Sequence, residues 1–242
     1  MRFLTLALIV VSVCLSHRSA GSAPPPEALW QPEQAATPAG RRLIALLGEL
    51  RRNVRTTRYQ HQFEVRQQEG FYGWDCSLLA AWVLRRAAPV AFRALGEKRP
   101  LASDFYRAID RAPTARGRRG WQRLGHVSKA QPGDVFAWLR SPLSTSKVSG
   151  HVGFFVDAPA PVPALPGAFV ARIVDATSLP HQADTRANDG VCGFGFGTFL
   201  FVTDAAGEPA GPSTGETVAY GWFGTESPGL MPARVIFGRV WR

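Results

Sequence analysis

The segment Phe71-Tyr-Gly-Trp-Asp-Cys-Ser77 runs directly into Leu78-Leu-Ala-Ala-Trp-Val-Leu-Arg-Arg86. Apolar side chains in the second part recur at helical spacing and form one face. Asp75 stands at the N-cap position, so we expect a helix that places Cys76 in its first turn. The unpaired N–H groups and positive dipole end of such a turn stabilise a thiolate. Cys76 is therefore a candidate nucleophile, because a buried structural cysteine would be expected within the apolar run.

Helical and β patterns occupy different parts of the chain. Residues 41–55 and 103–112 show helical spacing of apolar side chains, and residues 113–120 are typical of a loop. Short aromatic or β-branched runs follow between Gly- and Pro-rich turns, at residues 134–139, 152–156, 169–174, 195–202 and 234–241. This order predicts an α+β fold with N-terminal helices packed on a five- to six-stranded antiparallel sheet. No repeat or clean linker divides residues 41–242, so we expect one domain there.

The first 22 residues have the pattern of a cleaved secretory signal peptide. A positive start at Arg2 precedes an apolar run and a stretch of small residues. That run is shorter than the roughly 20 residues that span a bilayer, and no later segment is longer, so we expect no permanent membrane span. Residues 23–40, rich in Pro, Ala and Gln, are typical of a flexible leader. The protein is thus expected to be secreted or periplasmic.

The composition is that of a basic globular protein. The 242 residues include 28 Lys plus Arg against 18 Asp plus Glu, a net charge of +10, and 45% are apolar. These values exclude collagen-like, coiled-coil and wholly disordered chains. The region from Arg85 to Lys129 is strongly basic, which predicts either a site for anionic envelope polymers or a solvated basic face. Nucleic acid is not expected as a partner, because no helix-turn-helix, finger or aromatic–basic motif occurs.

A thiolate nucleophile needs an imidazole within hydrogen-bond reach and a polar group that orients this imidazole. His151 opens one predicted strand and Asp175 ends the next, so adjacent antiparallel strands can place the two side by side. They are therefore the candidate partners of Cys76. The remaining histidines have surroundings typical of the signal peptide, the surface or loops: His17, His61, His126 and His181.

Four short motifs between residues 72 and 178 follow one another in a characteristic order. They are D-C-S at the helix start, P-G-D before an aromatic strand, G-H-V-G at the next strand, and a polar residue followed by A-x-S. Together they resemble the NlpC-type papain-like cysteine peptidases of bacterial cell walls. The resemblance implies a peptide or other amide bond of peptidoglycan as substrate, and no metal or cofactor. It implies these site residues: Cys76 as nucleophile, His151 as base and acid, Asp175 as orienting residue, and Tyr72, Trp74 and Ser77 in substrate binding.

Some features depart from the family pattern and keep alternatives open. Leu78 stands where a small Gly is usual, residues 97–130 form a long Arg-rich segment, and residues 193–199 are aromatic and Gly-rich. An amidase, an acyltransferase or a non-catalytic envelope-binding module on the same fold are therefore alternatives. A disulfide between Cys76 and Cys192 would favour the structural role. A zinc site of His151, Asp175 and His181 is a further alternative, although it lacks the usual ligand spacing.

Overall fold

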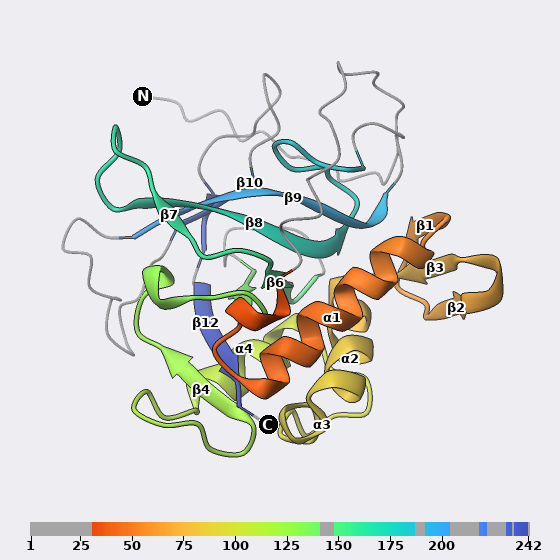
Figure 1. Cartoon of the computed structure of the whole chain (residues 1–242), viewed down its shortest axis with the longest axis horizontal. Helices are drawn as coiled ribbons and strands as arrows, with labels where there is room; N and C mark the ends of the chain where they lie inside the picture. The colour runs from red at the N-terminus through yellow and green to blue at the C-terminus, as the bar shows by residue number, and fades with distance from the viewer. Residues whose placement is uncertain are drawn as a thin grey trace, which may run out of the picture.

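A computed structural model describes residues 31–140, 148–186, 192–203, 218–221, 231–233 and 235–241. The fold is mixed α+β, as the sequence predicts. The α-helices of the described residues are α1 (Pro38–Asn53), α2 (Cys76–Ala87), α3 (Pro89–Arg93) and α4 (Ala102–Asp110). Figure 1 shows them gathered against one side of a curled antiparallel sheet. None of these helices has the length and apolar character needed to cross a membrane.

Six strands make up most of the main sheet, in the order β9-β8-β6-β5-β12-β4. They are β4 (Trp121–Leu124), β5 (Val135–Leu139), β6 (Gly150–Phe155), β8 (Ala168–Thr177), β9 (Gly193–Val202) and β12 (Val235–Val240). Three short strands widen the sheet: β10 (Val218–Gly221) and β11 (Met231–Pro232) lie beyond β9, and β7 (Ala160–Pro161) pairs with β8. The six neighbouring strands from β9 to β4 agree with the expected five to six, and β4 occupies a stretch for which no strand was predicted.

A separate three-stranded sheet precedes the helix that carries Cys76. Its strands β1 (Thr56–Tyr59), β2 (Glu64–Arg66) and β3 (Phe71–Trp74) lie in the order β1-β3-β2, with β1 parallel to β3. Short 3-10 turns, η2 (Pro32–Gln34), η3 (Gln67–Glu69) and η4 (Val127–Lys129), complete the regular structure. Because β3 leads straight into α2, this small sheet fixes the start of the helix.

Two apolar clusters lie on opposite faces of the main sheet, because neighbouring side chains of a strand alternate between its faces. Val135 and Phe154 belong to the cluster beneath the helices. The residues that follow them, Phe136 and Phe155, belong to the second cluster, with Phe201 and Phe237. Among the described residues, the helices therefore cover one of these two apolar faces.

Residues 31–40 are folded onto the domain, which corrects their assignment to a flexible leader. Thr37 is buried, and its hydroxyl donates to the carbonyl oxygen of Val240 at 2.7 Å and accepts from the amide of Gly40 at 3.0 Å. Thr37 is thus the N-cap of α1, and Pro38 suits the first helical position because it needs no backbone N–H there. The rest of the expected leader and the expected signal peptide lie outside the described residues.

Candidate active site

Cys76 is the first residue of α2, at the junction with β3. The side chain of Asp75 caps the helix, since its Oδ1 accepts from the backbone N–H of Leu78 at 2.8 Å. Cys76 is a free cysteine and is 5% exposed. A Cys76–Cys192 disulfide is therefore not formed. The local sequence thus places a thiol among the unpaired N–H groups of a helix N-terminus.

His151 of β6 and Asp175 of β8 form a direct pair. The distance between His151 Nε2 and Asp175 Oδ2 is 2.6 Å, and the Asp175 side chain is fully buried. His151 also makes a side-chain hydrogen bond with Cys76. Because Nε2 is directed at Asp175, Nδ1 is the imidazole nitrogen available to Cys76. The structure thus brings the three residues together in the order thiol, imidazole and carboxylate.

The charges of the three groups favour a protonated imidazole. Burial alone would lower the pKa of His151, but the charge of Cys76 and hydrogen bonds to Asp175 and Cys76 raise it to about 10. Burial likewise opposes ionisation of Asp175, yet the positive charges of His181 and Arg186 hold its pKa well below the ordinary value. A buried carboxylate beside the imidazole therefore supports an imidazolium, which in turn stabilises a thiolate.

Three buried residues surround Asp175, and the sequence suggests a role for only one of them, His181, as a ligand of the zinc alternative. His181 Nε2 lies 2.9 Å from Asp175 Oδ2, and Arg186 Nη1 donates to Asp175 Oδ1 at 2.8 Å. Asp184 accepts from Arg186 Nε at 2.9 Å and from Nη2 at 2.7 Å. His181 was assigned to a loop by its neighbouring Pro180, and that position is correct. Its burial could not be read from the sequence, because it results from packing of the loop against β9.

Two further residues from the small sheet and its loop face the start of α2. His61 Nδ1 lies 3.0 Å from Asp75 Oδ2, while the His61 side chain is 65% exposed. Burial and the nearby charges of Cys76, Asp75 and Asp175 raise the pKa of Tyr59, so its hydroxyl stays protonated at neutral pH. The polar, Gln-rich sequence around His61 predicts a surface residue, and no sequence pattern selects Tyr59. The structure places Tyr59 near the charge of Cys76 and His61 against Asp75.

The residues expected to bind substrate lie in the interior. Tyr72 is 2% exposed and Trp74 is fully buried, and both belong to the helix-side core. Ser77 is also buried, and its hydroxyl donates to Asp75 Oδ1 at 2.8 Å. Tyr72 and Trp74 alternate with Gly73 in β3, but both faces of this strand are covered. Their position is therefore that of support for the junction carrying Cys76.

The three residues of the zinc alternative do converge. The Nε2 atoms of His151 and His181 are, however, both directed at one oxygen of Asp175, whose other oxygen binds Arg186. Among the described residues, no group of three or more His, Cys, Asp or Glu is arranged to hold a metal ion. The geometry is that of a hydrogen-bonded ion network.

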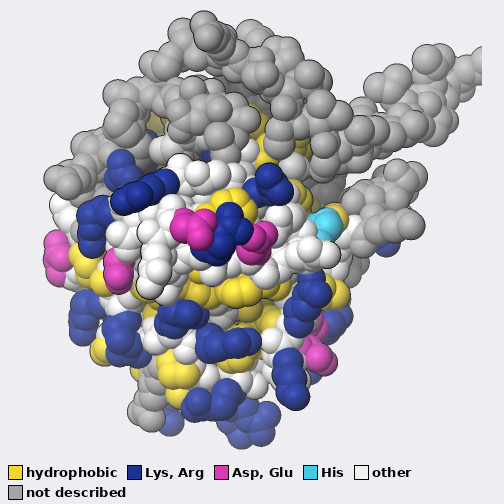
Figure 2. Space-filling view, turned by 90° about the vertical axis from the view of Figure 1, so that its right-hand side faces the viewer, with side chains coloured by type: hydrophobic (Ala, Val, Ile, Leu, Met, Phe, Trp, Pro, Cys, Tyr) yellow, Lys and Arg dark blue, Asp and Glu magenta, His cyan; other side chains and the backbone are white. Residues whose placement is uncertain are grey.

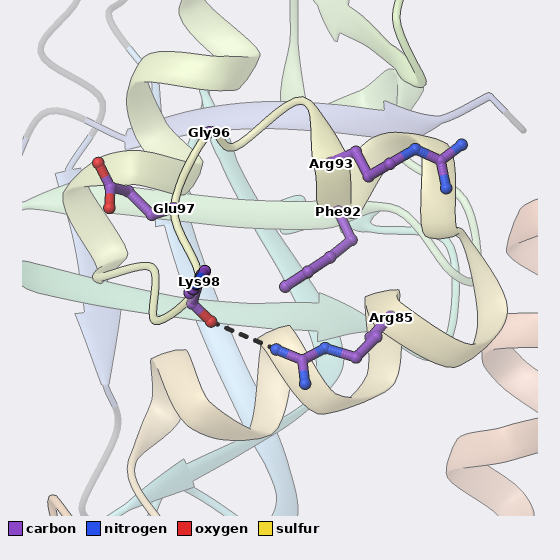
Figure 3. Close-up of a pocket in the computed structure, with 6 residues that line it drawn as sticks. All are labelled: Arg85, Phe92, Arg93, Gly96, Glu97 and Lys98. Carbon is purple, nitrogen blue, oxygen red and sulfur yellow. Dashed lines mark hydrogen bonds between the residues drawn. The ribbon is translucent and has the colours of Figure 1, made fainter.

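A basic hollow lies at the opposite end of α2 from Cys76. It has a volume of about 620 Å³ and is lined by Arg85, Phe92, Arg93, Gly96, Glu97 and Lys98. Arg85 donates to the Lys98 carbonyl oxygen at 3.3 Å, and its guanidinium carbon lies 4.6 Å from the centre of the Phe92 ring (Figure 3). Figure 2 shows Lys and Arg side chains spread over the face that lies on the right of Figure 1. The start of the expected basic region therefore includes a hollowed surface.

We compared the chain with family models, curated proteins and solved structures, and none of the three comparisons found a match.

Proposed function

We propose that the protein is an exported thiol hydrolase of the papain-like NlpC type that cleaves amide bonds of peptidoglycan. The observation that carries this proposal is the hydrogen-bonded series Cys76, His151 and Asp175, with Cys76 at a helix N-terminus. The motif order along the sequence supports the family, and the mixed α+β fold is compatible with it. Export is supported by the pattern of the first 22 residues.

The first chemical step forms an acyl-enzyme. The thiolate of Cys76 attacks the carbonyl carbon of the amide, and the carbonyl oxygen takes up negative charge. The backbone N–H of Cys76, at the start of the helix, is suited to donate to this oxyanion. The C–N bond then breaks, and His151 gives its Nδ1 proton to the departing amine while its Nε2–H remains bonded to Asp175.

Water completes the reaction. The neutral imidazole left by the first step removes a proton from water, whose oxygen attacks the thioester carbon. The C–S bond breaks, the acid product leaves, and Cys76 and His151 return to their thiolate–imidazolium state. An amine entering in place of water would instead produce acyl transfer, so the same residues also serve the alternative acyltransferase.

The test is digestion of purified peptidoglycan, with the soluble products identified by mass spectrometry. We expect wild type to release fragments that carry a new carboxyl group and its matching amine, and C76A to release none. The H126A variant is a matched control, because His126 caps η4 and bonds to Ser128 on another part of the molecule. Cleavage by C76A at the wild-type rate would overturn the proposal. If wild type binds peptidoglycan but does not cleave it, the non-catalytic envelope-binding alternative is favoured.

We also propose that the basic hollow at the end of α2 holds an anionic group of an envelope polymer. A guanidinium matches phosphate geometry, and Arg85 is already held in place by Phe92 and the Lys98 carbonyl. Fluorescence anisotropy with labelled inorganic polyphosphate tests this proposal, with polyglutamate as the carboxylate comparison. We expect R85A/R93A to weaken polyphosphate binding at least ten-fold. The R116A/R119A variant removes the same charge from exposed positions outside the hollow, and an equal loss in both variants would refute a specific site.

A further inference from the structure

Every second residue at the start of β9 is a glycine, and this pattern creates space beside Asp175. Gly193, Gly195 and Gly197 pair with Thr177, Asp175 and Ile173 of β8. A Cβ on Gly195 would lie 2.6 Å from both Cγ and Nε of Arg186. A Cβ on Gly197 would lie 2.6 Å from the Cβ of His181. His181 and Arg186, which follow β8 in the chain, therefore rest on a strand surface that has no side chains of its own.

Arg186 is the best-anchored side chain on this glycine surface. Its Nη1 donates to Asp175 Oδ1 and to the carbonyl oxygen of Gly193, each at 2.8 Å. Its remaining donors engage Asp184, and the side chains of Arg186 and Asp184 are 2% and 0% exposed. These contacts fix the position of the Arg186 guanidinium. They therefore also fix Asp175 Oδ1, which accepts a hydrogen bond from this guanidinium.

A buried carboxylate at this position requires a compensating cation. Removing a carboxylate from water strongly favours its neutral form unless a positive charge lies close by. A protonated Asp175 would lose the negative charge that supports the imidazolium of His151. The other oxygen of Asp175 is already shared by His151 and His181, so the carboxylate orientation also depends on the bond to Arg186.

We infer that Arg186, seated on the glycines of β9, is a positioning residue that keeps Asp175 ionised and oriented toward His151. Arg186 is not expected to touch substrate. The inference rests on the proposed function in taking Cys76 and His151 as the reacting pair. It assigns a role to the Gly-rich aromatic strand, which the resemblance to the peptidase family leaves unexplained.

The first test measures the rate of Cys76 alkylation by iodoacetamide from pH 5 to pH 9. We expect R186M to lower the rate at pH 6 at least ten-fold, to the level of D175N, and R186K to recover part of that loss. In the D175N background, R186M should change the rate less than two-fold, because Arg186 acts through Asp175. A purely structural role would instead lower the rate in both backgrounds.

The second test leaves Arg186 in the chain and uses two glycine substitutions. G195A should displace the guanidinium and lower alkylation at pH 6 in the same direction as R186M. G238A, in β12, is the matched control, because a Cβ on Gly238 would also lie 2.6 Å from a side-chain atom, here Cγ1 of Ile109. G238A should lower the melting temperature and leave the pH profile unchanged. Folding of every variant is checked by circular dichroism, so that G195A and R186K test the inference if R186M does not fold.

Two outcomes would overturn the role of Arg186: a wild-type pH profile in folded R186M, or equal losses in the wild-type and D175N backgrounds. Failure of the proposed hydrolase gives a different result. In that case wild type would not cleave peptidoglycan, or C76A would cleave it as fast as wild type, whereas the alkylation profiles would continue to report on the coupling between Arg186 and Cys76.

Discussion

At the scale of single residues, the pair of Cys76 and His151 determines how the thiol reacts. The charge of Cys76 and the hydrogen bonds to it and to Asp175 raise the pKa of His151 to about 10, so the imidazolium persists through neutral pH. We expect Cys76 at pH 6 to react with iodoacetamide at least ten-fold faster than a free thiol, whose pKa is about 8.5. H151A should abolish this advantage and H126A should retain it. Equal rates for wild type and H151A would contradict an ion pair.

Asp157 provides a pH-dependent contribution to stability away from the site. Burial raises the pKa of its carboxyl to about 6, against the opposing hydrogen bond from the Arg172 amide. The folded state therefore holds this proton more tightly than the unfolded state, and stability is lost as pH rises from about 4 to about 6. D157N keeps an acceptor for Arg172 and removes the titration. Between these pH values, the free energy of unfolding in urea should rise for D157N relative to wild type, by at most about 3 kcal/mol. A difference between the two proteins that does not change with pH would refute the raised pKa of Asp157.

At the scale of one element, the Asp75 cap is expected to stabilise the start of α2. Asp75 accepts from both Leu78 N–H and the Ser77 hydroxyl. D75A should lower the free energy of unfolding by about 1 kcal/mol. D75N should retain most of the stabilisation that the cap provides, because Asn is also a good N-cap residue. Urea unfolding measures both variants, with D110A as the exposed comparison, since Asp110 forms a surface pair with Arg123. Equal losses in D75A and D75N would indicate that charge, and not capping, stabilises this end.

Elements whose pattern is local could be predicted from the sequence. The helix over residues 76–86 agrees with α2 because its cap and its apolar face lie within one short segment. The small sheet could not be predicted in this way, because the parallel pairing of β1 with β3 depends on contacts across a 3-10 turn and a third strand. Residues 31–40 were misassigned because Pro and Ala are common both in flexible leaders and in helix starts.

At the scale of the whole molecule, β12 connects the edge strand β4 to the rest of the main sheet. Phe237 in this strand is buried and packs on Phe155 and Phe201, with ring centres 6.0 and 5.5 Å away. F237A should lower the free energy of unfolding by about 3–5 kcal/mol, because it removes a large side chain from the core. F63A is the comparison. Phe63 is 51% exposed, so its substitution should lower the free energy of unfolding far less. Similar losses in urea unfolding would contradict the central role of β12.

The candidate site was predictable where neighbouring strands or a helix start bring residues together. Cys76, His151 and Asp175 follow from a helix cap and two adjacent strands, and the geometry places them as the sequence suggests. Arg186 and Asp184 could not be selected, because charged residues in a loop are usually exposed. Their burial depends on the glycines of β9, a relation between distant segments that no local pattern contains.

The position of β12 also sets the order of events during synthesis. β12 is translated after every other strand described, yet it lies between β5 and β4, which are made much earlier. Until residues 235–240 emerge from the ribosome, the two neighbouring edges have no partner and the sheet beneath His151 is incomplete. A product that stops before Val235 is therefore expected to be an open, aggregation-prone chain with an unformed site. The proposed hydrolase would then gain its activity only once translation has passed β12.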